Sequence, residues 1–345
     1  MDILIILLIL TVVTVALFDF TNGFHDASDM VATAIASRAM TPTVAILLVT
    51  LCTFISPFLI SLAVADTIGT FINLNNTENI IAQSIIISGL FAAVTYNLVT
   101  WKLGLPSSST NSLVGGLVGS ALFGVGNEYI NWGIASIQSG TLEGVMKIVT
   151  GLFFSPVAGF IVGFVLMKIF MVVFSRFTLQ SRKLFVFSQY LSISWLGFSH
   201  GANDAQKGMA IITMALLSSG MISDFVVPYW VIIICALSIS LGTLFGGWSI
   251  IKTLGYGIIK VKTIHSFTDQ MGSALVNTIA TYMGAPTSTT QVVTATLIGV
   301  GGAEKPKHIR WNTVFSIIGG WFLNIPISMF LGAIYCFLLL TLIKG

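Results

Sequence analysis

Long apolar stretches alternate with short polar stretches along most of this chain. Each apolar stretch approaches or exceeds the ~20 residues that an α-helix needs to cross the hydrocarbon core of a bilayer. The stretches cover residues 1–18, 43–65, 80–99, 145–174, 225–251 and 311–343. This pattern predicts an all-α integral membrane protein that crosses the bilayer several times.

Composition supports lipid as the main solvent. Of the 345 residues, 55% are hydrophobic and 8% are charged, and the mean hydropathy is +0.98, whereas a soluble domain carries about 25% charged residues. A net charge of +3 is too small to indicate a nucleic-acid partner. The three cysteines lie inside apolar stretches without the spacing of metal ligands, so we interpret them as packing side chains.

Basic residues are concentrated in alternate loops. Segments 66–79, 126–144 and 218–228 contain no Lys or Arg, while most basic residues lie in the intervening polar segments. Because basic loops stay on the cytoplasmic side, we expect five crossings in each half of the chain. Both termini would then lie outside, and residues 175–187 would form a cytoplasmic connecting loop.

Two motifs occur twice in the chain, in the same order. Residues 22–27 (Asn-Gly-Phe-His-Asp-Ala) align with residues 200–205 (His-Gly-Ala-Asn-Asp-Ala) at an offset of 178. Residues 104–111 (Gly-Leu-Pro-Ser-Ser-Ser-Thr-Asn) align with residues 284–291 (Gly-Ala-Pro-Thr-Ser-Thr-Thr-Gln) at an offset of 180. Ordered matches at nearly one offset indicate an internal duplication.

The duplication predicts the domain organisation. An odd number of crossings per half inverts the second half relative to the first, so we expect two inverted-topology repeats, residues 1–174 and 188–345. Broken helices and re-entrant hairpins are expected at matching places in the two repeats. Such an architecture typically places a transporter site between the repeats, near the bilayer midplane.

The repeated aspartates Asp26 and Asp204 are candidate cation ligands. A carboxylate at membrane depth costs a few kcal/mol or more unless it is paired, solvated or bound to an ion. Gly23 and Gly201 are expected to let the backbone open there and expose carbonyl groups, so oxygen ligands for a hard cation would gather. The alternative interpretation is an aspartate that caps a half-helix. The candidate cation ligands are Asn22, His25, Asp26, Asn97, Asn203, Asp204 and Asn277, with sodium at Asp26, Asp204 and Asn203.

The repeated Pro-Ser/Thr motif is a candidate oxyanion site. Proline followed by Ser and Thr begins a half-helix whose free N–H groups and positive dipole end attract anions. Hydroxyl donors from two such helices could enclose a tetrahedral anion, although Ser and Thr can also only satisfy helix backbone or pack helices. The candidate substrate ligands are Asp26, Asp204, Ser107, Ser108, Ser109, Thr110, Thr287, Ser288, Thr289 and Thr290.

These paired motifs resemble the inorganic phosphate transporter (PiT) family, whose members are sodium- or proton-coupled phosphate permeases. The resemblance runs from about residue 19 to residue 326 and includes the segment 242–253. It implies an all-helical protein of two inverted halves, with phosphate between them and cations next to the two aspartates. It also implies a homodimer in a prokaryotic plasma membrane and no cofactor beyond the coupling cation.

The coupling ion stays open at this point. His25 stands where the second half has Asn203, and Thr53 and Thr243 lie where some members of the family carry Glu. We favour sodium over a proton.

Three other functions would use some of the same features. An anion channel could also be lined by half-helix ends and hydroxyls, and a sulfate carrier would use the same tetrahedral geometry. Phosphate is preferred because it keeps a proton near neutral pH, which a carboxylate can accept while it repels sulfate. An enzyme is not expected, because the motifs contain no Ser/His/Asp or metal-ligand cluster.

Overall fold

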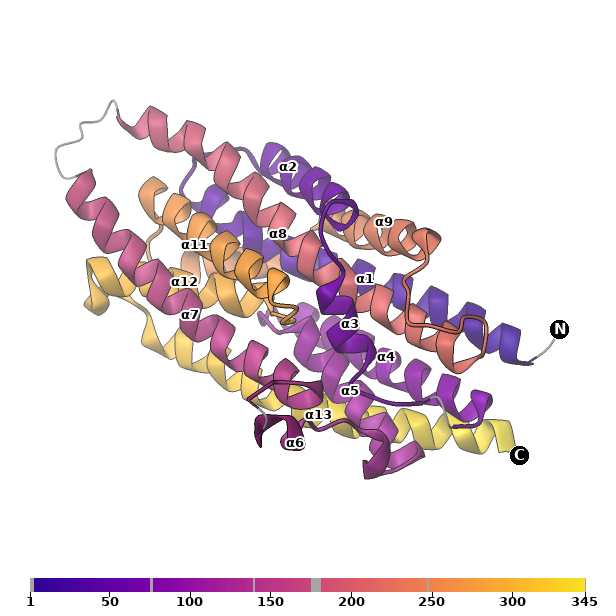
Figure 1. Ribbon diagram of the computed structural model, residues 1–345. Coiled ribbons are helices and arrows are strands. Elements are labelled where there is room, and N and C mark those ends of the chain that lie inside the picture. Colours follow the sequence, from indigo (N-terminus) through magenta and orange to yellow (C-terminus); the bar gives the residue numbers. More distant parts are fainter. Residues whose placement is uncertain (1–2, 75–76, 139, 175–180, 247, 345) are drawn as a thin grey trace.

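The computed structural model describes residues 3–344 except 75–76, 139, 175–180 and 247, and these residues form helices without a β-strand (Figure 1). The α-helices are α1 (Ile3–Ala36), α2 (Pro42–Ile55), α3 (Ala63–Gly69), α4 (Asn79–Lys102), α5 (Ser109–Gly124), α6 (Ile134–Gln138), α7 (Gly144–Val173), α8 (Ser181–Ser218), α9 (Tyr229–Phe245), α10 (Trp248–Gly257), α11 (Thr263–Tyr282), α12 (Thr289–Glu304) and α13 (Trp311–Lys344). Short 3₁₀-helices follow α2, α5 and α12: η1 (Ser56–Phe58), η2 (Asn127–Tyr129) and η3 (Pro306–His308).

Several helices are suited to a membrane. Among the described residues, α1, α4, α7 and α13 are each long and apolar enough to cross a bilayer, and α2 with η1 and α3 makes a fifth candidate bent by 76°. In α7 and α13 only 17% of the most apolar window is buried, and Phe153 and Phe322 are 58% and 67% exposed. Apolar faces of this extent require lipid. The predicted all-helical class is confirmed, and these exposed apolar helices support the expectation of a membrane protein.

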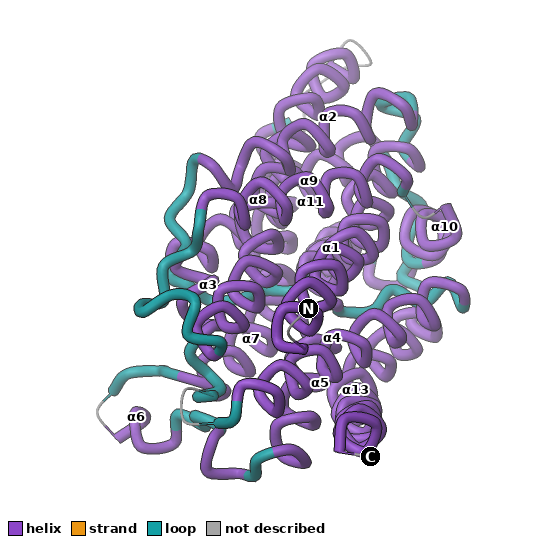
Figure 2. The backbone as a smooth tube through the Cα atoms, turned by 90° about the vertical axis from the view of Figure 1, so that its right-hand side faces the viewer, coloured by secondary structure: helices purple, strands orange, loops and turns teal. Residues whose placement is uncertain are grey.

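Helices α1 and α8, which carry the repeated aspartates, lie side by side inside the bundle (Figures 1 and 2). The expectation that the backbone opens at Gly23 and Gly201 is wrong, because both helices continue through these positions. A Cβ on Gly23 would lie 2.0 Å from the carbonyl oxygen of Ile239, and one on Gly201 would lie 2.3 Å from that of Thr53. These glycines therefore let α9 approach α1 and α2 approach α8, as small residues do between membrane helices.

Two helical hairpins carry the Pro-Ser/Thr motifs at their tips. One consists of α4 and α5, the other of α11 and α12. Gly104 and Gly284 end α4 and α11 in the left-handed region, with φ of 67° and 65°, which glycine adopts without a steric penalty. Ser108 and Ser288 cap α5 and α12, and each accepts a hydrogen bond from the backbone N–H three residues later, at 3.1 and 3.4 Å. The two tips thus share one local geometry.

The hairpins meet tip to tip inside the bundle. Thr110 Oγ1 of the first tip donates to the Thr287 carbonyl oxygen of the second at 2.8 Å. Outside them, α7 packs on α12 and α13 packs on α5, so each long apolar helix covers the hairpin of the other half. Both chain ends lie at one end of the bundle (Figures 1 and 2). Helix α8 begins at Ser181, so the segment expected to be a loop, 175–187, already contains its first turns; residues 175–180 lie outside the described part.

Candidate functional site

A buried cluster of polar side chains lies where α1, α8 and the two hairpin tips meet. We call it the polar centre. Each of its members is at most 4% exposed, and burial of so many polar groups is costly unless they pair with one another or with ligands. Its members are Asn22, His25, Asp26, Asp29, Ser107, Ser109, Thr110, His200, Asn203, Asp204, Lys207, Thr287, Thr289 and Thr290.

Asp26, on α1, contacts groups from both halves of the chain. Thr290 Oγ1, on α12, donates to Asp26 Oδ1 at 2.7 Å. The Nδ1 atoms of His25 and His200 each lie 3.8 Å from an Asp26 oxygen. Thr290 also contacts Asp29, one helical turn farther along α1. Since a hydroxyl has one proton, Thr290 can donate to only one of these carboxylates, and the other contact needs a proton or cation of its own.

Asp204, on α8, is bound more tightly by its neighbours. Lys207 Nζ donates to Asp204 Oδ2 at 2.7 Å, and Asn22 Nδ2, from α1, donates to the same oxygen at 3.1 Å. Thr289 Oγ1 donates to Oδ1 at 3.4 Å, and His200 Nδ1 lies 3.8 Å from that atom. Both oxygens of the Asp204 carboxylate therefore have a donor, from α1, α8 or α12.

The first hairpin tip reaches the centre through three side chains. Ser109 Oγ donates to Asn22 Oδ1 at 2.5 Å, and Ser107 Oγ lies 3.4 Å from His25 Nε2. Thr110 makes the contact with the second tip described above. This tip therefore contacts α1 directly, and any movement of the hairpin would disturb the groups that surround Asp26.

The second tip is fixed to α8 through Asn203. Its Oδ1 accepts from the Thr287 backbone N–H at 3.0 Å, and its Nδ2 donates to Thr281 Oγ1 at 2.9 Å and to the Ala285 carbonyl at 3.2 Å. Thr287 Oγ1 donates to Asn277 Oδ1 at 3.3 Å. Asn203 thus holds the hairpin backbone, and its three hydrogen bonds all stay within the second half.

Four candidates from the sequence lie at the edge of the centre, and one of them is Asn277, which accepts from Thr287 as described above. The hydroxyl oxygens of Ser108 and Ser288 serve as helix caps, although a capping hydroxyl still has its proton to donate. Asn97 accepts from Ser112 Oγ at 2.9 Å, inside the first hairpin. These four residues support the tips, whereas the other predicted ligands belong to the centre itself.

Sequence reasoning missed Asp29 and Lys207 and gave His200 no binding role. Asp29 and Lys207 each stand three residues after a repeated aspartate. Residues at i and i+3 share one face of a helix, and charged residues within membrane segments are expected to face the protein interior. That spacing was the signal available in the sequence.

Two overlapping groups could hold a cation. His25, Asp26 and Asp29 form one, and Asp26, His200 and Asp204 form the other, each with ligand atoms within 4.8 Å of one another. Carboxylate oxygens suit hard cations, and both groups can also exchange protons. Asp26 belongs to both groups, so an ion bound at one group would change the ion affinity of the other.

Comparison with known proteins identifies the family. A family model described as the phosphate transporter family matches residues 22–332. The chain is a member of the phosphate transporter family. It is 37% identical over 333 residues to a probable low-affinity inorganic phosphate transporter of Rhizobium meliloti, and the alignment covers 96% of each chain. It is 36% identical to a probable low-affinity inorganic phosphate transporter of Bacillus subtilis, over 98% of this chain and 99% of the relative. The family resemblance inferred from the motifs is confirmed, and these relatives are named as transporters, not enzymes.

A solved structure supports the fold. The chain resembles a structure described as "The sodium-dependent phosphate transporter" with a TM-score of 0.83, at 22% sequence identity, over 96% of this chain and 98% of the other. At that identity the likeness concerns the fold. The helical arrangement described above is therefore one that a phosphate transporter also adopts.

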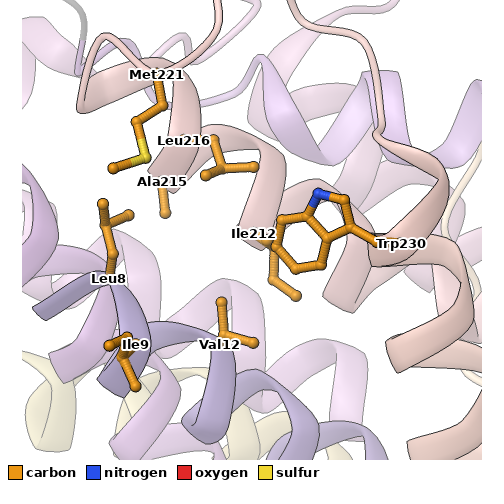
Figure 3. A pocket seen from close by; sticks show the side chains of 8 residues that line it. All are labelled: Leu8, Ile9, Val12, Ile212, Ala215, Leu216, Met221 and Trp230. Carbon is orange, nitrogen blue, oxygen red and sulfur yellow. The ribbon is translucent and has the colours of Figure 1, made fainter. Parts of the chain in front are cut away.

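Two cavities in the described part of this family member lie away from the polar centre. One, of about 240 Å³, is lined by apolar side chains of α1, α8, the segment after α8 and the start of α9, including Val12, Leu216 and Trp230 (Figure 3). The other, of about 660 Å³, lies between α7 and α13 and is also largely apolar. The only polar side chains that line either cavity are Asn111, Gln291 and the indoles, and neither cavity has a charged lining residue, so the polar centre stays the substrate-site candidate.

Proposed function

We propose that this protein is a secondary active transporter that carries inorganic phosphate by symport with a cation, sodium in preference to a proton. The observation that supports this most strongly is the meeting of two hydroxyl-rich helix starts with two aspartates in one buried centre. Hydroxyl groups and helix N-termini are donors suited to an oxyanion. The carboxylates are ligands suited to the coupling cation.

The proposal includes the architecture. The hairpins α4–α5 and α11–α12 have matching glycine ends and serine caps, and their tips approach each other from opposite halves. We propose that the halves are inverted repeats with the hairpins re-entrant and the site near the midplane. A homodimer in a prokaryotic plasma membrane, with both termini outside, completes the proposal.

Charge explains why a cation must accompany phosphate. Asp26, Asp29 and Asp204 lie in the centre with one ammonium, that of Lys207. Two like charges 4 Å apart repel by about 4 kcal/mol at an effective dielectric constant near 20. Anionic phosphate would therefore bind weakly beside unneutralised carboxylates. A bound cation removes this repulsion, so cation and phosphate bind cooperatively.

Transport requires that the centre open to one side at a time. With the hairpin tips in contact, the side chains of the centre are at most 4% exposed, so phosphate could not pass between the tips as they stand. Thr110 and Thr287 share one direct hydrogen bond, and Lys207 Nζ also bonds to both residues. Separation of the tips must therefore break the direct bond and at least one of the two lysine bonds.

Uptake into proteoliposomes tests the proposal. Labelled phosphate should accumulate above its external concentration when an inward sodium gradient is imposed, and less or not at all under a pH gradient alone. Excess unlabelled phosphate should compete strongly and sulfate weakly. Uptake that only equilibrates would indicate a channel, and equal competition by sulfate would remove the preference for phosphate.

A further inference from the structure

Lys207 is a buried cation at the point where α8 and the two hairpin tips meet. Its Nζ donates to Asp204 Oδ2 at 2.7 Å, to the Thr287 carbonyl oxygen at 3.0 Å and to Thr110 Oγ1, and the residue is 0% exposed. An ammonium group has three N–H donors and no acceptor. Three oxygens from α8, the second tip and the first tip therefore use all three protons.

The same three oxygens would suit a small hard cation. A carboxylate, a backbone carbonyl and a hydroxyl are the kinds of oxygen that such ions take in proteins. We infer that the Lys207 ammonium permanently fills the second of two equivalent cation positions, so that the mobile coupling cation binds only at Asp26 and Asp29. This inference rests on the proposed function of the chain as a cation-coupled carrier.

The first half has an acid at the equivalent position. Asp29 follows Asp26 by three residues, as Lys207 follows Asp204. Asp29 Oδ1 and His25 Nδ1 are buried atoms without a hydrogen-bond partner in the described part of the chain. The ligands at Asp26 and Asp29 thus have bonding capacity left for an ion, whereas both Asp204 oxygens already have donors.

A fixed cation changes the ion count of the carrier. Lys207 balances the charge of Asp204 in every state of the cycle and cannot leave with phosphate. The two carboxylates of the first half have no such fixed ammonium beside them, so a mobile ion has to neutralise them. The cycle would therefore carry one cation fewer than a carrier in which both positions bind free ions.

Equilibrium binding of radioactive sodium to the purified full-length protein tests the inference, with and without phosphate. Lys207→Ala removes the ammonium and leaves space for an ion, and this variant should bind one more sodium ion per chain than the wild type. Lys207→Met removes the charge but fills the space, so its sodium count should not rise. Lys307→Ala, which removes an exposed lysine, is the control and should match the wild type.

The effect on phosphate gives a second readout. Without sodium, Lys207→Ala should bind phosphate about tenfold or more weakly than the wild type, because the Asp204 carboxylate, no longer paired with an ammonium, then repels the anion. Sodium should restore most of that loss in Lys207→Ala but not in Lys207→Met. Asp204→Asn in the Lys207→Ala background should abolish the extra sodium ion.

Two results would overturn the inference. One is an unchanged sodium count in Lys207→Ala. The other needs no lysine variant and so does not depend on its folding: a wild-type sodium site that is lost in Asp204→Asn but kept in Asp26→Asn. Absence of phosphate binding by the wild type would instead count against the proposed function, since the sodium count is measured separately on phosphate-free protein.

Discussion

Replacement of Asp26 by asparagine removes one charge from the centre with almost no change of shape. Asp26 accepts from Thr290 at 2.7 Å and has two histidine nitrogens at 3.8 Å. Asparagine keeps an oxygen for Thr290, so the fold and the hairpin contact should survive. What changes is the attraction between this position and a bound cation.

The size of the effect follows from that geometry. A full charge at about 4 Å contributes about 4 kcal/mol at an effective dielectric constant near 20, and the amide oxygen retains part of it. We therefore expect a net loss of about 1.5–3 kcal/mol, as for other bonds to charged groups, or roughly tenfold to hundredfold in cation affinity. Asparagine also removes the repulsion of phosphate that the cation relieves, so the cation should enhance phosphate affinity by a smaller factor, and phosphate should enhance cation affinity by that same factor.

Phosphate binding to purified Asp26→Asn, measured across a sodium titration and repeated at several pH values, checks this expectation. Asp224→Asn, in an exposed loop outside the centre, is the matched control and should retain the wild-type sodium dependence. If Asp26→Asn binds phosphate with the same sodium and pH dependence as the control, Asp26 has only a structural role. The coupling site would then have to be sought elsewhere.

Three further expectations concern topology, packing and the second tip. Cysteines at Asn131 and Lys262 should be labelled from opposite sides of the membrane, with Asn131 outside, and labelling of both from outside would refute the predicted topology. Gly23→Ala should lower the thermal unfolding midpoint by several degrees, because overpacking costs about 1–3 kcal/mol, whereas Gly319→Ala, with open space around it, should not. Ser288→Ala should cost about 1 kcal/mol of stability as a lost cap and weaken phosphate binding about tenfold as a lost donor; unchanged binding isotherms would restrict this serine to capping.

Hydropathy predicted the outer helices well and the central ones poorly. The stretches 145–174 and 311–343 correspond closely to α7 and α13. The apolar stretch 1–18 covers only about the first half of α1. The second half of this helix carries polar side chains, so it was not included in the stretch. Those side chains face other polar groups inside the bundle, not lipid, so hydropathy falls while the helix continues. A window average cannot distinguish such a segment from a loop.

The sequence indicated which motifs form the candidate site, but it did not indicate which side chains contact one another there. The duplicated motifs indicated Asp26, Asp204 and the two tips, and the structure brings these together. They did not indicate that Lys207 would contact both tips, because that depends on how α8 crosses the hairpins. Contacts between residues as distant in sequence as Thr110 and Thr287 are set by tertiary packing, on which local sequence carries no direct information.

Each of the two aspartates is contacted by a side chain that belongs to the motif of the other half. These contacts link the two carboxylates. Asn22 precedes Asp26 by one helical turn, yet it donates to Asp204 at 3.1 Å. His200 precedes Asp204 by one turn, and its Nδ1 lies 3.8 Å from an oxygen of each aspartate. A change of charge at either carboxylate therefore reaches the other through one side chain. An ion bound at one carboxylate would therefore change the ion affinity of the other, and the ammonium that we infer to be fixed beside Asp204 would act on Asp26 by the same route.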